Sequence, residues 1–220
     1  MSEPMTKPAK RGWTLRQQGK RRDILDAAIE LFCEMGYQGM SIDALVERVG
    51  GSKSTIYSYF GDKEGLYRAA VTRFSELALE KNEQALRDIT CMDDDSGSVE
   101  ATLTEFLEGL LRATTTPEFS RFNVLCASSQ SSFPNLGMDF FENGPGRSQS
   151  RIAKYLAGAD KRGVLKVSDP DMAAAALIGA VRANHLWARL FRPDMPAMSE
   201  QEIRKHVAYC IRMFMAAHAA

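Results

Sequence analysis

Apolar residues recur three and four positions apart along most of the chain, which is the spacing of one face of an α-helix. Ile24, Ala28, Leu31 and Met35 show this pattern near the front of the chain. The sequence contains neither the strict apolar–polar alternation of a strand nor an internal repeat. The pattern therefore predicts an all-α protein. The predicted helices, about nine, cover residues 20–35, 41–49, 52–60, 62–89, 98–113, 116–130, 138–162, 170–191 and 199 to near the end of the chain.

Polar caps and breaking residues mark where several of these helices begin or weaken. Glycine and proline at 144–146 form a weak spot inside the long predicted helix 138–162. The acidic, non-periodic stretch 91–97 is the best break between structural layers. The predicted N-caps are Ser41, Ser52, Asp62, Asp169 and Ser199, the last in a capping box with Glu202.

The charge distribution separates the front of the chain from its middle. Residues 1–22 hold seven Lys and Arg against one acid, whereas residues 80–108 hold nine acids against two bases. A basic front end suggests a polyanionic partner there, although a solubilising tail would have the same composition. We expect a basic flexible arm at 1–19, a helix-turn-helix DNA-binding domain at 20–66 and a helical effector-binding and dimerisation domain at 67–220.

Composition and missing motifs exclude several classes of protein. No run of about 18 apolar residues spans a membrane, and no secretory signal opens the sequence, so we expect a cytoplasmic protein without a membrane partner. Cys33, Cys91, Cys126 and Cys210 are scattered, which favours buried thiols over disulfides or a zinc site.

Signals for enzymatic chemistry are missing as well. The sequence has no phosphate-binding loop, no dinucleotide-binding glycine motif and no H-E-x-x-H. Its three histidines, His185, His206 and His218, lack metal-ligand spacing, and the acidic run at 93–95 lacks the rest of a calcium loop. We expect no enzyme activity, metal or cofactor.

The stretch 41–66 carries the strongest functional signal. Two short helices flank a Gly50-Gly51 turn, which is the layout of a helix-turn-helix whose second helix enters the major groove of DNA. Ile56 and Phe60 share the face that should pack inward, while hydroxyls, tyrosines and a lysine surround the rest of that helix. The alternative is a small three-helix core that binds nothing.

Residues 24–32, 41–49 and 52–66 (SKSTIYSYFGDKEGL) resemble the DNA-binding domain of the TetR family of bacterial regulators. The resemblance implies an all-α homodimer with a divergent C-terminal domain that often binds a small effector. It also implies a set of DNA contacts at matching positions. These positions are Ser41, Lys53, Ser54, Thr55, Tyr57, Ser58, Tyr59 and Lys63.

Two residues depart from the family pattern. Gly51 stands where the family usually has a branched apolar residue, and a second glycine there should loosen the turn. Asp43, in the first turn of its helix, suits the helix dipole but repels phosphate, so we leave it out of the contact set. Residues 117–165 are also similar to the AefR-like C-terminal domain, which suggests control of efflux or cell-density genes.

The last two predicted helices are the best candidates for pairing two copies of the chain. Small residues at 173–176 and Gly179, with Ile178 and Val181, permit close helix approach, and residues 211 and 213–215 add apolar area. Intramolecular core is the alternative for both stripes.

A mostly apolar pocket with sparse polar anchors is compatible with the large apolar groups around the third quarter of the chain, although ordinary core has the same composition. The residues predicted to line it are Phe106, Phe122, Phe133, Phe141, Tyr155, Asn184, His185 and Trp187.

The sequence therefore predicts a homodimeric repressor that binds a pseudo-palindromic operator and is released by a small apolar or amphipathic effector. The fourth helix would transmit the effector signal to the head. Two other classes stay open. One is a DNA-binding or architectural protein without an effector, and the other is an all-α interaction module or enzyme that does not bind DNA.

Overall fold

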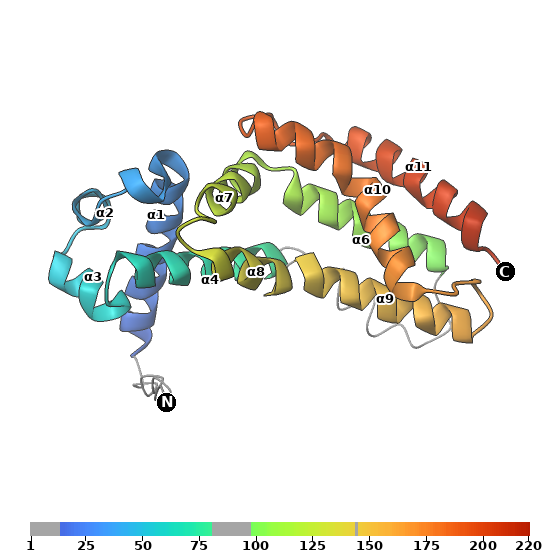
Figure 1. The fold of residues 1–220 in the computed structure, drawn as a ribbon, viewed down its shortest axis with the longest axis horizontal. Coiled ribbons are helices and arrows are strands. Elements are labelled where there is room, and N and C mark those ends of the chain that lie inside the picture. Colours follow the sequence, from blue (N-terminus) through green and yellow to red (C-terminus); the bar gives the residue numbers. More distant parts are fainter. Residues whose placement is uncertain (1–13, 81–97, 144) are drawn as a thin grey trace.

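The computed structural model describes residues 14–80, 98–143 and 145–220 of the chain. It is all-α, as predicted, and the extended pairing seen within these residues is an isolated bridge between Leu165 and Ala219. A small head of α1–α4 lies at one end of an elongated molecule, and α6–α11 form the body (Figure 1). The helices are α1 (Leu15–Gly39), α2 (Ile42–Val49), α3 (Lys53–Phe60), α4 (Lys63–Glu80), α6 (Val99–Thr114), α7 (Pro117–Ser128), α8 (Pro134–Asn143), α9 (Pro145–Lys161), α10 (Pro170–Phe191) and α11 (Glu200–His218).

Helix α1 begins earlier than the sequence pattern predicted. Thr14 caps it by accepting a hydrogen bond from the Gln17 N–H, and Gln17 Oε1 in turn accepts a hydrogen bond from the Thr14 backbone N–H. This capping box places residues 15–19 in α1. The helix therefore begins five residues before the predicted start at residue 20, and these residues do not belong to the predicted flexible arm at 1–19. The rest of the predicted arm, residues 1–13, lies outside the described residues.

Most predicted helix starts are confirmed by their caps. Ser41, Ser52, Asp169 and Ser199 each accept a hydrogen bond from a backbone N–H in the first turn of the helix that follows. The stretch predicted as one helix at 138–162 belongs to two helices, α8 and α9, and Pro145, which lies in the predicted weak spot, is the first residue of α9. The predicted end of the fourth helix at 81–89 and the acidic break at 91–97 lie outside the described residues.

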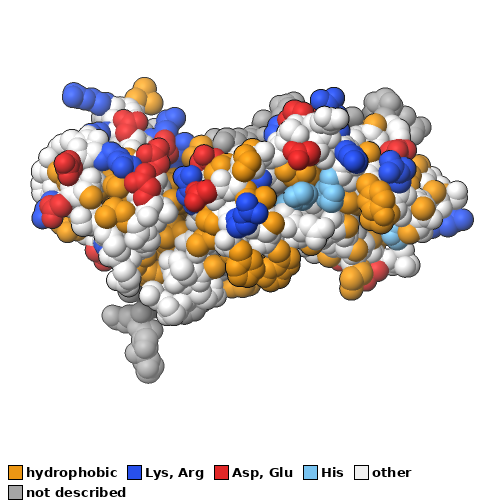
Figure 2. All heavy atoms as spheres, turned by 90° about the horizontal axis from the view of Figure 1, so that it is seen from above, with side chains coloured by type: hydrophobic (Ala, Val, Ile, Leu, Met, Phe, Trp, Pro, Cys, Tyr) orange, Lys and Arg blue, Asp and Glu red, His pale blue; other side chains and the backbone are white. Residues whose placement is uncertain are grey.

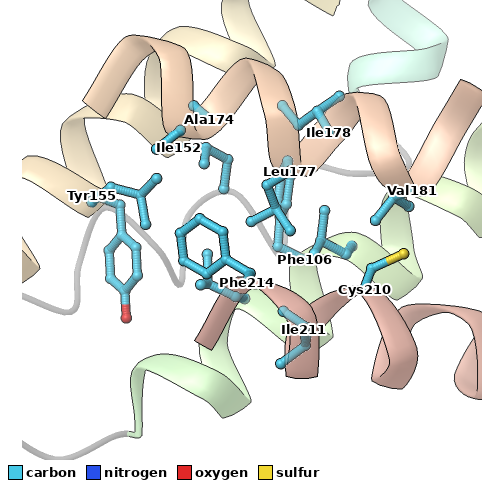
Figure 3. Packing of buried hydrophobic residues seen from close by; sticks show 14 of the residues in the cluster. Phe106, Ile152, Tyr155, Ala174, Leu177, Ile178, Val181, Cys210, Ile211 and Phe214 are labelled. Atoms are coloured by element: carbon cyan, nitrogen blue, oxygen red, sulfur yellow. The ribbon is translucent and has the colours of Figure 1, made fainter. Parts of the chain in front are cut away.

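Two separate apolar cores hold the molecule together. The body core joins α6, α9, α10 and α11; Figure 3 shows Leu177 and Val181 of α10 facing Phe106 of α6 and Ile211 of α11. The head core contains Ile24, Phe32, Leu45, Ile56 and Leu66, but it does not stop at α4. It continues into α7 and α8 through Phe119, Phe122, Leu125 and Phe140.

Aromatic stacking makes this joint between head and body continuous. The Phe74 ring of α4 lies on the Phe122 ring of α7, with centroids 3.7 Å apart and planes 9° from parallel. Nearby, the buried Tyr67 hydroxyl donates to Ser129 Oγ over 3.0 Å. The head is therefore packed as one unit with α7 and α8. The contacts that join them are made by residues far apart in the sequence.

The outward faces of α10 and α11 carry apolar side chains that the body core does not cover. Figure 2 shows hydrophobic side chains on this side of the body, close to the histidines. Trp187 and Phe191 of α10 are 61% and 79% exposed, and Tyr209 and Met213 of α11 are also exposed. Most residues predicted for the pairing surface lie elsewhere: Ala173, Ala174, Ile178, Val181, Ile211 and Phe214 are buried in the body core.

The described cysteines are free thiols, and Cys210 is buried while Cys33 and Cys126 are half-buried. Burial raises the pKa of Cys33 to about 11 and that of Cys126 to about 12. Both sulfurs are therefore protonated near neutral pH, as expected of thiols that pack against the core.

Candidate nucleic-acid interface

Helices α2 and α3 form the predicted helix-turn-helix. Ser41 caps α2 by accepting from the Ala44 N–H over 3.1 Å, and Ile42 and Leu45 bury the inner face of the helix. The chain then turns at Gly50 and Gly51, whose φ angles are +69° and +101°. A branched residue rarely adopts such angles, so the second glycine, which departs from the family pattern, suits the backbone found here.

The exposed part of α3 presents hydroxyls, a lysine and a tyrosine. Ser52 Oγ lies 2.7 Å from Ser54 Oγ and 3.0 Å from Thr55 Oγ1, which forms a hydroxyl cluster at the start of the helix. Ile56 is buried, so the helix can turn its other faces outward. Tyr57 is 44% exposed, and Ser58 is exposed although its hydroxyl donates to the Thr55 carbonyl oxygen.

Tyr59 differs from the other predicted contacts on α3. It is half-buried, packs against the head core and lies with its ring centroid 6.0 Å from that of Phe60. This packing shows that Tyr59 stabilises the fold of the head, whether or not it also contacts DNA. Its role in binding DNA stays a prediction.

Lys53, the first residue of α3, is paired with an acid of the neighbouring helix. Its ammonium Nζ lies 2.7 Å from Asp43 Oδ1, and both side chains are more than half exposed. The hydrogen bond to Asp43, followed by the attraction of its charge, raises the pKa of Lys53. The pair joins the start of α2 to the start of the helix that would enter the groove.

Lys63, the first residue of α4, reaches back towards the end of α1. Its Nζ donates to the Gln38 carbonyl oxygen over 3.3 Å and lies 4.7 Å from the centroid of the Tyr37 ring. Partial burial lowers the pKa of Lys63. These contacts hold the Lys63 ammonium at the end of α1, and Lys63 itself opens α4, whose first turn suits a phosphate.

Gly65 allows the first turn of α4 to pack directly on the end of α3. A Cβ atom added at Gly65 would collide with the carbonyl oxygen of Phe60. Asp62 caps α4 by accepting from the Gly65 N–H over 2.7 Å, as predicted for that cap. The orientation of α3 relative to α4 therefore depends on a residue without a side chain.

Further charged residues hold α2 and α3 in place. Lys20 Nζ donates to the carbonyl oxygen of Val49 at the end of α2 over 2.8 Å, and the Arg21 guanidinium lies 5.2 Å from the Phe60 ring centroid. Arg48 of α2 bridges Glu30 and Glu34 of α1. Sequence reasoning missed these roles. A signal was available for Arg48, a cation in the last turn of its own helix.

The residues predicted to line an effector pocket do not gather in one place. Phe106 and Tyr155 belong to the body core, whereas Phe122 and Phe133 belong to the head core. The other four lie closer to the surface: Phe141, Asn184 and Trp187 are exposed and His185 is half-buried. A pocket built from this set stays a prediction.

An open hollow of about 450 Å³ lies along α6. It is lined by Ser98, Ala101 and Thr104 together with the acids Glu100, Glu105 and Glu108, and it includes none of the predicted pocket residues. Its acidic rim does not suit the mostly apolar ligand that the sequence suggested.

His185 and His206 meet between α10 and α11. Their ring centroids are 4.9 Å apart in an edge-to-face arrangement, and His206 Nε2 lies 3.0 Å from the Val181 carbonyl oxygen. Burial, followed by the charges of His206 and Arg189, lowers the pKa of His185. In the part of the chain that the structure describes, no three His, Cys, Asp or Glu side chains are arranged to hold a metal ion.

A helix-turn-helix head on a helical body defines a DNA-binding regulator, and comparison with known families gives the same class. Residues 24–70 match the N-terminal domain of bacterial regulatory proteins of the tetR family. Residues 101–220 match the C-terminal domain of AefR-like transcriptional repressors. The chain belongs to the TetR family of transcriptional regulators, as its sequence resemblance predicted.

Curated relatives are similar over part of the chain. The repressor ComR of Escherichia coli is 33% identical over 98 residues, which cover 44% of each chain. The activator FasR of Mycolicibacterium smegmatis is 35% identical over 81 residues, which cover 37% of each chain. The chain thus matches less than half the length of these relatives.

Solved structures share the whole fold. A TetR-family regulator from Mesorhizobium loti has a TM-score of 0.80 at 24% identity and covers 94% of this chain and 100% of its own. The flavonoid-responsive regulator FrrA has a TM-score of 0.63 at 28% identity and covers 91% of this chain and 98% of its own. Among the described residues, no helix is both long and apolar enough to span a membrane.

Proposed function

We propose that this regulator is a cytoplasmic homodimer that represses transcription by placing the α3 helices of two protomers in successive major grooves of a pseudo-palindromic operator. The observation that carries the proposal is the exposed start of α3, which presents hydroxyls and Lys53, while Lys63 opens the helix that follows. Tyr57 extends this surface along the helix.

The outward stripe of α10 supports the pairing of two copies. Exposed residues recur along the helix at one face, with large apolar groups at its ends and small ones in the middle. Small residues let two helices approach closely, and Trp187 and Phe191 supply apolar area that a twofold partner would cover. The stripe consists of Met172, Ala176, Gly179, Ala180, Ala183, Trp187 and Phe191.

Helix α7 is the element through which we infer that the body acts on the head. It packs against α1 and α10, and Phe122 anchors it in the head core. At the same time, Arg121 Nε donates to Asp194 of the loop between α10 and α11 over 2.9 Å. An effector that moved α10 would therefore move α7 and, with it, the head. This route would act in addition to α4, the helix that the sequence predicted to transmit the signal.

Two measurements test the proposed function. The first selects the sequences that the protein binds from a random DNA pool, and the second measures the mass of the protein–DNA complex. We expect a twofold-symmetric sequence bound by two protomers, and repression of a reporter placed behind it. Absence of any selected sequence at low salt would refute DNA binding, and activation of the reporter would refute repression.

The second candidate is a regulator that needs no effector. The division of the predicted pocket residues between two cores and the surface favours it. A thermal-shift screen with apolar and amphipathic small molecules separates the two, because an effector that binds the folded protein raises its melting temperature.

A further inference from the structure

The pair formed by Asp43 and Lys53 lies where the head would meet DNA. Asp43 is in the first turn of α2, and Lys53 opens α3. The N-terminal residues of a recognition helix are the ones that reach base edges. A carboxylate 2.7 Å from the only lysine of α3 is therefore unfavourable for generic DNA binding, because it opposes the phosphate charge.

We propose that Asp43 is a specificity determinant, a positioning residue that acts on DNA recognition through Lys53. The inference rests on the proposed function, because it concerns how α3 reads DNA. Asp43 holds the Lys53 ammonium to one side and uses one of its three N–H donors. The remaining donors are free to engage base-edge acceptors such as guanine O6 and N7 while the carboxylate stays in place.

The same pair weakens binding to DNA of the wrong sequence. On a duplex of mixed sequence, the only new contact open to the Lys53 ammonium is with a phosphate. To form it, Lys53 must break its ion pair with Asp43. Asp43 is then left as an unpaired anion beside the polyanion. Asp43 therefore selects against complexes in which Lys53 finds no base edge, which raises the ratio of specific to non-specific affinity.

The pair is weak enough to be tested by substitution. Both side chains are more than half exposed, and exposed ion pairs change an equilibrium by about two- to fivefold. We expect Asp43→Asn to raise affinity for a short mixed-sequence duplex by about that factor. We also expect it to steepen the salt dependence of that binding by about 0.9 in log–log slope, because Lys53 becomes available to a phosphate.

Affinity for the best duplex selected from a random pool should change much less, so that the specificity ratio falls. Thermal unfolding of the variant confirms that α2 still folds, and Asp43→Glu, which keeps the carboxylate, should preserve the ratio. The matched control is Glu47→Gln, which removes an equal charge from an exposed acid one turn further along α2. In a Lys53→Met background, Asp43→Asn should no longer change the slope.

Several outcomes would overturn the proposal. It fails if Glu47→Gln and Asp43→Asn strengthen mixed-duplex binding equally, since the effect would then be general charge. It also fails if Asp43→Asn changes specific and non-specific affinity by the same factor, or if its effect persists without Lys53. If the wild-type protein selects no sequence and binds no duplex, the proposed function fails as well. If the wild-type protein binds selectively and Asp43→Asn leaves the ratio of specific to non-specific affinity unchanged, only this inference is refuted.

Discussion

Substitution of Gly65 by alanine tests how the head fixes the recognition helix. An alanine inside an exposed helix normally stabilises a protein by about 1 kcal/mol relative to glycine. At Gly65, however, the new Cβ would collide with the Phe60 carbonyl oxygen, and backbone atoms cannot move aside by changing rotamer. Overpacking of this kind costs about 1–3 kcal/mol, so we expect Gly65→Ala to destabilise the protein.

Gly19→Ala is the matched control, because Gly19 also lies in a helix and a Cβ there meets nothing within 4 Å. We expect the control to raise the melting temperature and Gly65→Ala to lower it, by about 2–4 °C for each kcal/mol in a protein of this size. Affinity for the selected duplex should also fall more in Gly65→Ala than its stability explains, because α3 must tilt to relieve the collision. Equal melting temperatures and equal affinities for the two variants would refute the reasoning.

Four further predictions follow from other parts of the structure. Phe122→Ala should destabilise the protein by about 3–5 kcal/mol in urea unfolding, because the ring is buried at the joint; a loss below about 1 kcal/mol would contradict the shared core. Trp187→Glu should convert dimers to monomers in sedimentation at micromolar concentration, and an unchanged mass would remove the α10 stripe from the interface. Lys63→Ala should weaken binding to every duplex alike and flatten the salt slope by about 0.9, whereas an unchanged slope would remove Lys63 from the phosphate contacts. The stability of the wild-type protein should fall as pH drops below 6.5, because the pKa of His185 is lower in the folded than in the unfolded chain and the unfolded chain binds the proton first; a His185→Gln variant with an identical pH profile would contradict this.

Local signals in the sequence were sufficient for most of the secondary structure. Ser52, Asp62 and Ser199 mark helix starts because a cap is made by residues close in sequence. The same reasoning missed the capping box at Thr14, since the basic composition around it suggested an arm. Helix periodicity also identified Ile56 as an inward-facing residue of α3, but it placed Tyr59 outward, whereas Tyr59 packs against the head core.

Packing between distant segments could not be predicted in the same way. Composition marks Phe122 and Phe106 as large apolar groups of a pocket or core, but it does not show that the first belongs to the head core and the second to the body core. For the same reason, the apolar stripes of α10 and α11 were read as one surface, although Ile211 faces the interior and Met213 faces outward. The partners of Lys20 and Lys53 likewise depend on how helices cross.

A hydroxyl-radical footprint on the selected duplex tests the central claim most directly. The account predicts two protected patches on one face of the DNA, with centres about 10 base pairs or somewhat more apart, in a complex that contains two protomers. A single protected patch bound by one protomer, or a duplex without protection, would contradict the account.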